Sequence, residues 1–299
     1  MACLPKGKTR FYYFKDRYAL LLLSLTSNQH ASKRDIRNSQ FAQLLDKAVV
    51  RTALYQAGHS GLCSETFDCV WPAHYQCYFL TLGMWGAKAK DPYLQTSRSG
   101  FNLVLQLNFS SEHDEPYRRL VDADDIRPFE FGGHPVAQGK LHTLAWSRMD
   151  IDFATGEALI EEIQNDWVRE AQWARRIAAS DNGPTYYWGS KIENDRVIRY
   201  VDGVLRQHEG LWQEAILAAT LWFLRHELGI SNIYYHTPES GAELKSIRYS
   251  LPPRSIYSTL PRQFCFKRTR SAPRLLVEHN RSRVWRQRLR DARFFQMTL

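Results

Sequence analysis

Residues 141–167, LHTLAWSRMDIDFATGEALIEEIQNDW, contain the clearest secondary-structure pattern of the chain. Two stretches rich in apolar residues, 141–152 and 157–166, are separated by a short loop that ends at Gly156. This arrangement is typical of a β-hairpin. Residues 167–179 have helical character, so we expect two antiparallel strands that lead directly into a helix.

The segments that follow continue the alternation of helices and strands. Residues 211–228 form an amphipathic pattern that predicts a long helix, and Gly229 is a typical residue to end it. Residues 230–236 predict a strand, 237–241 predict a turn that opens a short helix, and 263–268 predict a last strand. The predicted order is therefore strand, strand, helix, strand, helix, strand.

The first part of the chain also mixes both kinds of element. Residues 11–25 are continuously apolar and predict either a strand or a buried helix. Residues 39–56 have apolar side chains at helical spacing, with Ser39 as the expected N-cap. Residues 74–84 and 101–109 have the pattern of strands. The fold class predicted for the whole chain is α/β (α+β), a mixed sheet with flanking helices.

A loop with Gly132, Gly133 and Pro135 separates the two parts. A chain of 299 residues is long enough for about two domains. We therefore expect an N-terminal helix-and-strand region at 1–135 and a second domain at 136–299.

The formal net charge of +9 is concentrated at the C-terminal end. Residues 267–293 contain ten basic and two acidic residues, a net +8, which leaves 30 basic and 29 acidic residues, or +1, elsewhere. Within this tail, residues 279–295 predict a helix with Trp285, Leu289, Ala292 and Phe295 on one stripe. Its arginines would bind nucleic acid or an acidic partner, or would be solvated while the apolar stripe packs.

The composition also bears on the compartment. The longest apolar run, residues 19–25, is far shorter than the roughly 20 residues that span a bilayer, so we expect no membrane span. Five cysteines, an odd number, do not suggest a disulfide framework. We therefore expect a cytoplasmic protein with reduced thiols. Nothing in the sequence points to an oligomeric state.

The predicted order of elements resembles the core of the GNAT (acetyltransferase-like) fold. The segment 211–245 is similar to that family's succession of long helix, strand and short helix. Residues 161–167, Glu-Glu-Ile-Gln-Asn-Asp-Trp, also resemble a Glu-Glu-Ile-Gln-Ser-Asp-Trp motif of phage polyprotein segments. The GNAT resemblance implies transfer of an acyl group to an amine, either a small molecule or a protein, with acetyl-CoA or another acyl-CoA as donor.

One element of that family is missing. GNAT enzymes hold the coenzyme A pyrophosphate on backbone N–H groups of a Gln/Arg-x-x-Gly-x-Gly/Ala loop before the long helix. Residues 167–210 occupy this place and contain four glycines, but they contain no such motif. We therefore expect an acyltransferase with an atypical or lost coenzyme A loop.

The candidate catalytic residues lie at the ends of two predicted strands. Strand alternation would place Glu162 and Glu161 on opposite faces, and at least one of these carboxylates would act as a base in a cleft. The alternative is an ion pair with a nearby arginine such as Arg148. His236 would assist if its strand is adjacent, and the GNAT resemblance implies a tyrosine as general acid, for which Tyr257 is the candidate. The candidate substrate-binding residues are Gln164, Asn165, Asp166 and Tyr235.

Two other classes of function remain open. Asp150 or Asp152 with Glu162 and Gln164 resembles the PD-(D/E)xK nuclease arrangement, with Gln in place of Lys, and would bind Mg²⁺. No metal ligand is expected outside this nuclease alternative. The third class is a non-catalytic module that binds nucleic acid or protein through residues 267–293.

Overall fold

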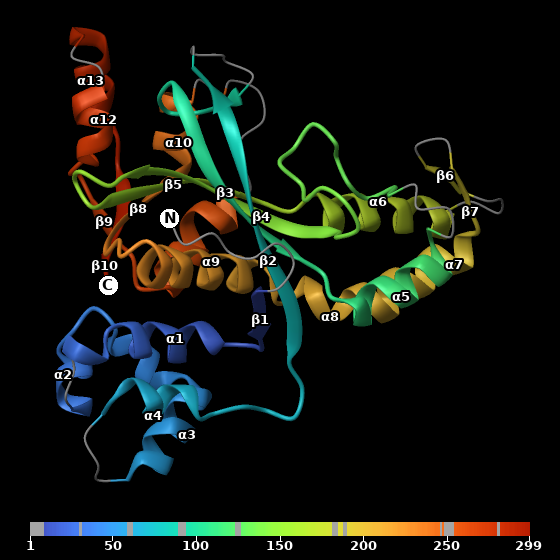
Figure 1. The fold of residues 1–299 in the computed structure, drawn as a ribbon, viewed down its shortest axis with the longest axis horizontal. Coiled ribbons are helices and arrows are strands. Elements are labelled where there is room, and N and C mark those ends of the chain that lie inside the picture. The colour runs from blue at the N-terminus through green and yellow to red at the C-terminus, as the bar shows by residue number, and fades with distance from the viewer. Residues whose placement is uncertain are drawn as a thin grey trace.

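A computed structural model describes residues 9–29, 32–58, 62–88, 94–122, 127–180, 185–187, 190–245, 247, 254–279 and 282–299. It is a mixed α/β structure, as the sequence predicts, with helices flanking one large sheet (Figure 1). The strands, in their order across this sheet, are β1 (Thr9–Tyr13), β2 (Gln76–Ala87), β3 (Gly100–Asn108), β4 (Thr143–Asp152), β5 (Glu157–Gln164), β8 (Asn232–His236), β10 (Phe294–Thr298) and β9 (Lys267–Thr269).

All neighbouring strands of this sheet are antiparallel except β5 and β8. The parallel pairing of β5 with β8 extends only from Glu157 with Asn232 to Ile160 with Tyr235. Beyond these residues the two strands separate. A small second sheet pairs β6 (Thr185–Tyr187) with β7 (Ser190–Ile192).

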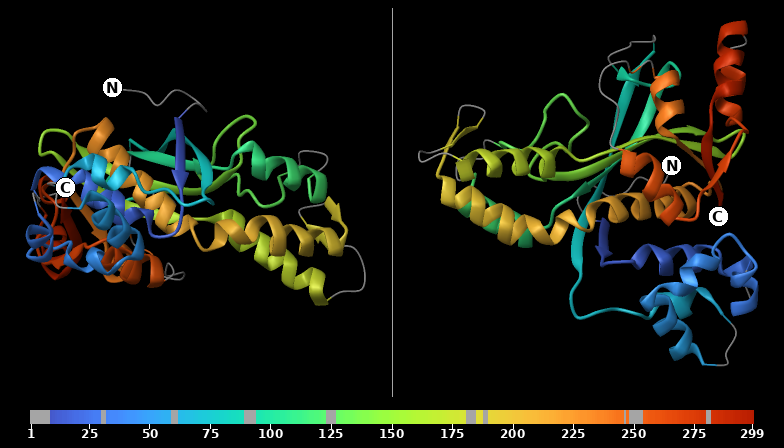
Figure 2. Two further views of the ribbon diagram at one scale, coloured as in Figure 1. Left: turned by 90° about the horizontal axis from the view of Figure 1, so that it is seen from below. Right: turned by 180° about the vertical axis from the view of Figure 1, so that it is seen from behind.

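The helices form three groups around the sheet (Figures 1 and 2). Helix α9 packs against β3 and β4, and the helices near the N-terminus lie beyond α9. A second group extends to one side, with β6 and β7 at its tip, and the last two helices lie at the opposite end. The first group consists of α1 (Arg17–Leu25), α2 (Lys33–Arg37), α3 (Ala48–Ala57), α4 (Ser64–Asp68) and α9 (Trp212–Trp222). The second consists of α5 (Ser111–Leu120), α6 (Asp166–Ser180), α7 (Asn194–Arg199) and α8 (Arg206–Glu209). The third consists of α12 (Arg274–His279) and α13 (Arg283–Asp291).

The remaining short helical pieces lie within these groups or between them and the strands. They are η1 (Ser27–Gln29), η2 (Ala42–Asp46), η4 (Tyr200–Leu205), η5 (Phe223–Glu227), α10 (Pro238–Leu244), η6 (Ser255–Thr259) and α11 (Leu260–Gln263). The predicted hairpin, the helix that follows it, the long helix and the strand after Gly229 are all confirmed.

Three local predictions are wrong. The helix predicted from Ser39 begins only at Ala48, because residues 42–46 form a 3₁₀ turn and Lys47 is the N-cap. The strand predicted at residues 263–268 is shorter and shifted, because β9 consists of Lys267–Thr269 and includes only the last two residues of the predicted range. Phe295 does not lie on the helix predicted for the tail, because α13 ends at Asp291 and Phe295 belongs to β10.

The basic tail is part of the folded structure. Strand β10 lies between β8 and β9, and the apolar stripe of α13 packs on the sheet. Trp285 and Leu289 join an apolar cluster that includes Leu159 and Tyr234, which confirms that the stripe packs. The proposed domain division at residue 135 stays a prediction, and strands from both sides of it pair in one sheet.

The two faces of the sheet differ in chemistry. On the core face, Leu105, Met149 and Ile163 are buried in the main apolar cluster together with α9. On the other face, here called the polar face, adjacent strands place Thr81, Gln106, Trp146 and Gln164 in one row. Within the described part of the chain, no helix has both the length and the apolar character needed to cross a bilayer.

Candidate functional site at the separation of β5 and β8

A β-bulge in β5 determines where its two glutamates point. Arg148 of β4 pairs with Glu162, whereas the next residue, Met149, pairs with Ile160. Glu161 is therefore the extra residue of the bulge and has no partner in β4. The predicted alternation, with Glu161 and Glu162 on opposite faces, is wrong, because the bulge directs both carboxylates to the polar face. The bulge also lies where β8 stops pairing with β5.

The carboxylate of Glu161 is fully buried and fully hydrogen-bonded. The backbone N–H of Ser97 donates to Oε1 at 3.1 Å, and the Ser97 hydroxyl lies 2.9 Å from Oε2. Nε2 of His236 lies 3.2 Å from Oε2 and 2.9 Å from the Ser97 hydroxyl. The other imidazole nitrogen, Nδ1, lies 3.0 Å from the Ser240 hydroxyl. The sequence analysis expected His236 to assist if its strand lies beside the strand of the two glutamates, and β8 does pair with β5.

These contacts indicate the protonation states. Burial favours the neutral acid, but the hydrogen bond and charge of His236, followed by the charges of Lys245 and Arg148, outweigh it and hold the pKa of Glu161 at about 2. Burial lowers the pKa of His236. Both ring nitrogens of His236 are engaged, Nε2 with Glu161 and Ser97 and Nδ1 with the Ser240 hydroxyl. We infer that His236 orients Glu161, since neither of its nitrogens is left to accept a substrate proton.

Glu162 lies beside two buried basic side chains. Nη2 of Arg148 donates to its Oε2 at 2.5 Å, which is the ion pair that the sequence offered as an alternative. Nζ of Lys245 lies 3.8 Å from the same oxygen and donates to the backbone carbonyl of Glu161 at 3.0 Å. The side chains of Arg148 and Lys245 are 2% and 1% exposed, whereas that of Glu162 is 14% exposed. Glu162 is therefore the carboxylate of this cluster that solvent and ligands can reach.

Residues 94–98 fold back over the cluster and bind three of its members. Arg148 donates to the carbonyls of Leu94 and Gln95 at 2.7 and 2.8 Å, and Gln95 adopts the left-handed backbone conformation with φ of 50°. Ser97 holds Glu161, as described above. The guanidinium of Arg98 forms a bidentate pair with Asp150 at 2.5 and 2.8 Å. This segment replaces water as the hydrogen-bonding partner of a buried ionic network.

Two tyrosines approach the same gap from the core face. The rings of Tyr235 and Tyr257 are 5.6 Å apart, and Lys245 Nζ lies 5.9 Å from the Tyr257 ring. Both hydroxyls are buried, and neither has a hydrogen-bond partner among the described residues. Burial and the charge of Glu162 raise the pKa of both phenols well above 10, so each is a proton donor at neutral pH. All four predicted catalytic residues therefore gather at one gap.

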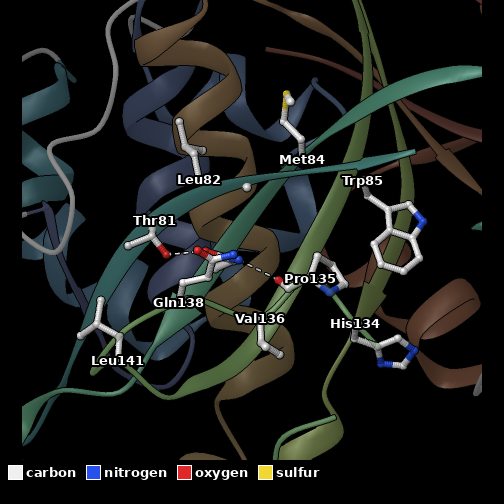
Figure 3. Close-up of a pocket in the computed structure, with 12 residues that line it drawn as sticks. Thr81, Leu82, Met84, Trp85, His134, Pro135, Val136, Gln138 and Leu141 are labelled. Atoms are coloured by element: carbon white, nitrogen blue, oxygen red, sulfur yellow. Dashed lines mark hydrogen bonds between the residues drawn. The ribbon is translucent and has the colours of Figure 1, made fainter. Parts of the chain in front are cut away.

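A groove of about 600 Å³ lies beside this cluster on the polar face (Figure 3). The hydroxyl of Thr81 donates to Gln106 at 2.6 Å, and the Gln106 amide donates to the Pro135 carbonyl at 2.7 Å. Trp85 also lines the groove, and the Arg148 guanidinium lies 5.8 Å from its ring. The groove thus adjoins the network that contains Glu162.

His134, at the edge of this groove, contacts the predicted substrate-binding residues. Its Nδ1 lies 2.6 Å from a carboxylate oxygen of Asp166 and 3.1 Å from the Gln164 amide. Asn165 accepts the N–H of Val168 at 2.7 Å and so caps the first turn of α6. Burial opposes ionisation of Asp166, but the hydrogen bond with His134 prevails and lowers its pKa. Gln164, Asn165 and Asp166 therefore form one cluster, whereas Tyr235 lies in the other.

The residues of the nuclease alternative lie in different surroundings. Asp150 is neutralised by Arg98, and Glu162 by Arg148. Asp152 accepts the backbone N–H of Ala154 in the β4–β5 turn. Among the described residues, no three His, Cys, Asp or Glu side chains gather in a way that could hold a metal ion. In this structure the carboxylates of Asp150 and Glu162 are therefore each paired with an arginine.

Sequence reasoning missed four members of the site: Ser97, Lys245, Arg98 and His134. Ser97 and Arg98 lie in a segment without a strand or helix pattern, and their contacts to β4 and β5 depend on how the β2–β3 connection folds back. Lys245 follows a short helix, where a lysine is normally solvated. His134 could have been singled out from the sequence as a candidate site residue, because it lies between Gly133 and Pro135 in the predicted loop.

Comparison with known proteins adds no relative. No protein-family model, curated protein or solved structure matches this chain.

Proposed function

We propose that the protein transfers an acyl group to an amine, and that the reaction takes place where β5 and β8 separate. The main support is the convergence of Glu162, Lys245 and Tyr257 on a gap between two parallel strands that stop pairing at a bulge. A mixed sheet with one parallel pair, followed by helix, strand and short helix, also agrees with the GNAT resemblance.

The proposed roles follow from burial and charge. Glu162, the accessible carboxylate, accepts the proton of the attacking amine. Arg148 and Lys245 hold Glu162 in place. Tyr257, which stays protonated, donates to the oxygen or sulfur on which negative charge develops. Glu161 and His236 act as positioning residues that fix the bulge.

Coenzyme A does not fit the place that the fold offers its pyrophosphate. That place is the first turn of α6, at the end of β5. Asn165 already caps one of its N–H groups, and Asp166 puts a buried carboxylate there. A pyrophosphate would meet a capped N–H group and a carboxylate that is already paired with His134 and Arg169, instead of free amide groups. We therefore propose an acyl donor whose binding does not depend on a pyrophosphate at this helix.

The test compares two thioesters, acetyl-CoA and acetyl-pantetheine, which lacks the pyrophosphate. Each is incubated with a panel of small amines and with a lysine-containing peptide, and acylated products are detected by mass spectrometry. We expect product from both donors at similar rates, and a 10²- to 10⁴-fold lower rate for Glu162→Gln. Glu243→Gln, which changes an exposed carboxylate on α10, is the matched control with an unchanged rate. Absence of product with both donors would refute the proposal.

We also propose a cytoplasmic location, because the described cysteines are free thiols. Cys63, Cys69, Cys77 and Cys265 are free thiols, and the first two are exposed. Exposed free thiols persist in a reducing compartment.

A further inference from the structure

A second cavity, of about 300 Å³, lies among α10, the helical segment η6–α11, β9 and β10. Its lining contains three arginines from three different segments: Arg254 next to η6, Arg262 in α11 and Arg268 in β9. Glu239 is the only carboxylate among the described residues that line it. The cavity therefore has an excess of two positive charges.

This excess is not neutralised within the described structure. Arg268 lies 3.6 Å from Glu239, a long and exposed ion pair. No carboxylate of the described residues forms an ion pair with Arg254 or Arg262. Like charges held on one concave surface repel one another, and an anion that binds between them removes this repulsion. Guanidinium groups also match phosphate oxygens with two parallel hydrogen bonds.

A buried donor also lines the cavity. Tyr257 contributes to the lining, and its buried hydroxyl has no partner among the described residues. A buried hydroxyl without a partner is unfavourable unless a ligand or water satisfies it. Tyr257 is thus a fourth donor beside the three arginines.

We propose that this cavity binds the phosphate group of a small phosphorylated molecule. The concave shape and the volume suit a ligand the size of a sugar phosphate. A nucleic-acid strand is less well matched, because Glu239 and Glu243 place negative charge along the adjacent helix α10. The proposal rests on the three arginines of the cavity; it shares only Tyr257 with the proposed acyl-transfer site and does not require acyl transfer.

The experiment is isothermal titration of the full chain at low ionic strength with three probes: inorganic phosphate, ribose 5-phosphate and a short single-stranded DNA. We expect ribose 5-phosphate to bind more tightly than phosphate, and Arg262→Gln to weaken it at least tenfold. Arg262→Lys, which keeps the charge but loses the planar fork, should weaken it less. The backbone carbonyl of Arg262, which accepts from Gln43, is unchanged in both variants.

The control is Arg286→Gln, which removes the same charge from the exposed face of α13. It should leave ribose 5-phosphate binding unchanged. Equal weakening by Arg262→Gln and Arg286→Gln would overturn the proposal, because binding would then follow net charge. It would also be overturned if neither phosphate nor ribose 5-phosphate binds, or if DNA binds more tightly than ribose 5-phosphate and loses affinity in Arg286→Gln.

Discussion

The two faces of strands β4 and β5 are stabilised in different ways. On the core face, Met149, Ile160 and Ile163 are buried against other apolar side chains. On the polar face, at the same depth, the ionisable side chains of Arg148, Glu161 and Lys245 are buried. Apolar packing tolerates small rearrangements, whereas a buried ion depends on each specific partner. The comparison teaches that the polar face is the more fragile one, which is expected of a site whose geometry matters.

The largest effect is expected when a buried ion is removed. Arg148→Met leaves Glu162 without its guanidinium and the carbonyls of Leu94 and Gln95 without donors. We expect the free energy of unfolding to fall by about 3–5 kcal/mol, measured by urea denaturation. Replacing both ions, in Arg148→Met/Glu162→Leu, should recover part of this loss.

The matched change on the core face is Met149→Ala, one residue along β4. It should cost about 2–5 kcal/mol through the cavity it creates, and Glu162→Leu should give it no rescue. If Arg148→Met were as stable as the unchanged protein, the ionic network would not stabilise the polar face.

The second effect is the pH dependence of stability. The pKa of Glu161 is about 2 in the folded protein, below the value of about 4.3 of an unfolded glutamate. A lowered folded pKa gives stability that is present above about pH 4.3 and is lost as the pH falls toward 2. The loss should be on the order of 3 kcal/mol.

Urea denaturation at several pH values between 5 and 2 measures this loss. Glu161→Gln should have a flatter profile over that window, whereas Met149→Ala should keep the profile of the unchanged protein. Parallel profiles for the unchanged protein and Glu161→Gln would contradict the assignment of Glu161 as an ionised, hydrogen-bonded carboxylate.

The smallest effect is expected from a polar group on the core face. Ser147 is fully buried next to Arg148, and its hydroxyl has no partner among the described residues. Ser147→Ala should therefore leave the free energy of unfolding unchanged or raise it by less than about 1 kcal/mol. Thermal unfolding measures this, with Ser97→Ala as the contrast. Ser97→Ala should destabilise the protein because the Ser97 hydroxyl contacts Glu161 and His236. A clear loss in Ser147→Ala would mean that its hydroxyl has a partner.

Much of the fold follows from local sequence patterns. The β4–β5 hairpin, α6, α9 and β8 were predictable because apolar spacing and the glycines at 156 and 229 act over short distances. Strand β10 was not, because residues 294–298 are a strand only when β8 and β9 lie on either side to pair with them.

The candidate site was predictable in its residue types but not in its geometry. The sequence by itself indicated Glu161, Glu162 and His236 as polar residues in predicted strands, and the GNAT resemblance added Tyr257. Only the tertiary structure decided that a bulge brings both glutamates to one face, and that Arg148, Lys245 and residues 94–98 neutralise them. The physical reason is that hydrophobic periodicity is encoded within one element, whereas the partner of a buried charge comes from a segment distant in the chain.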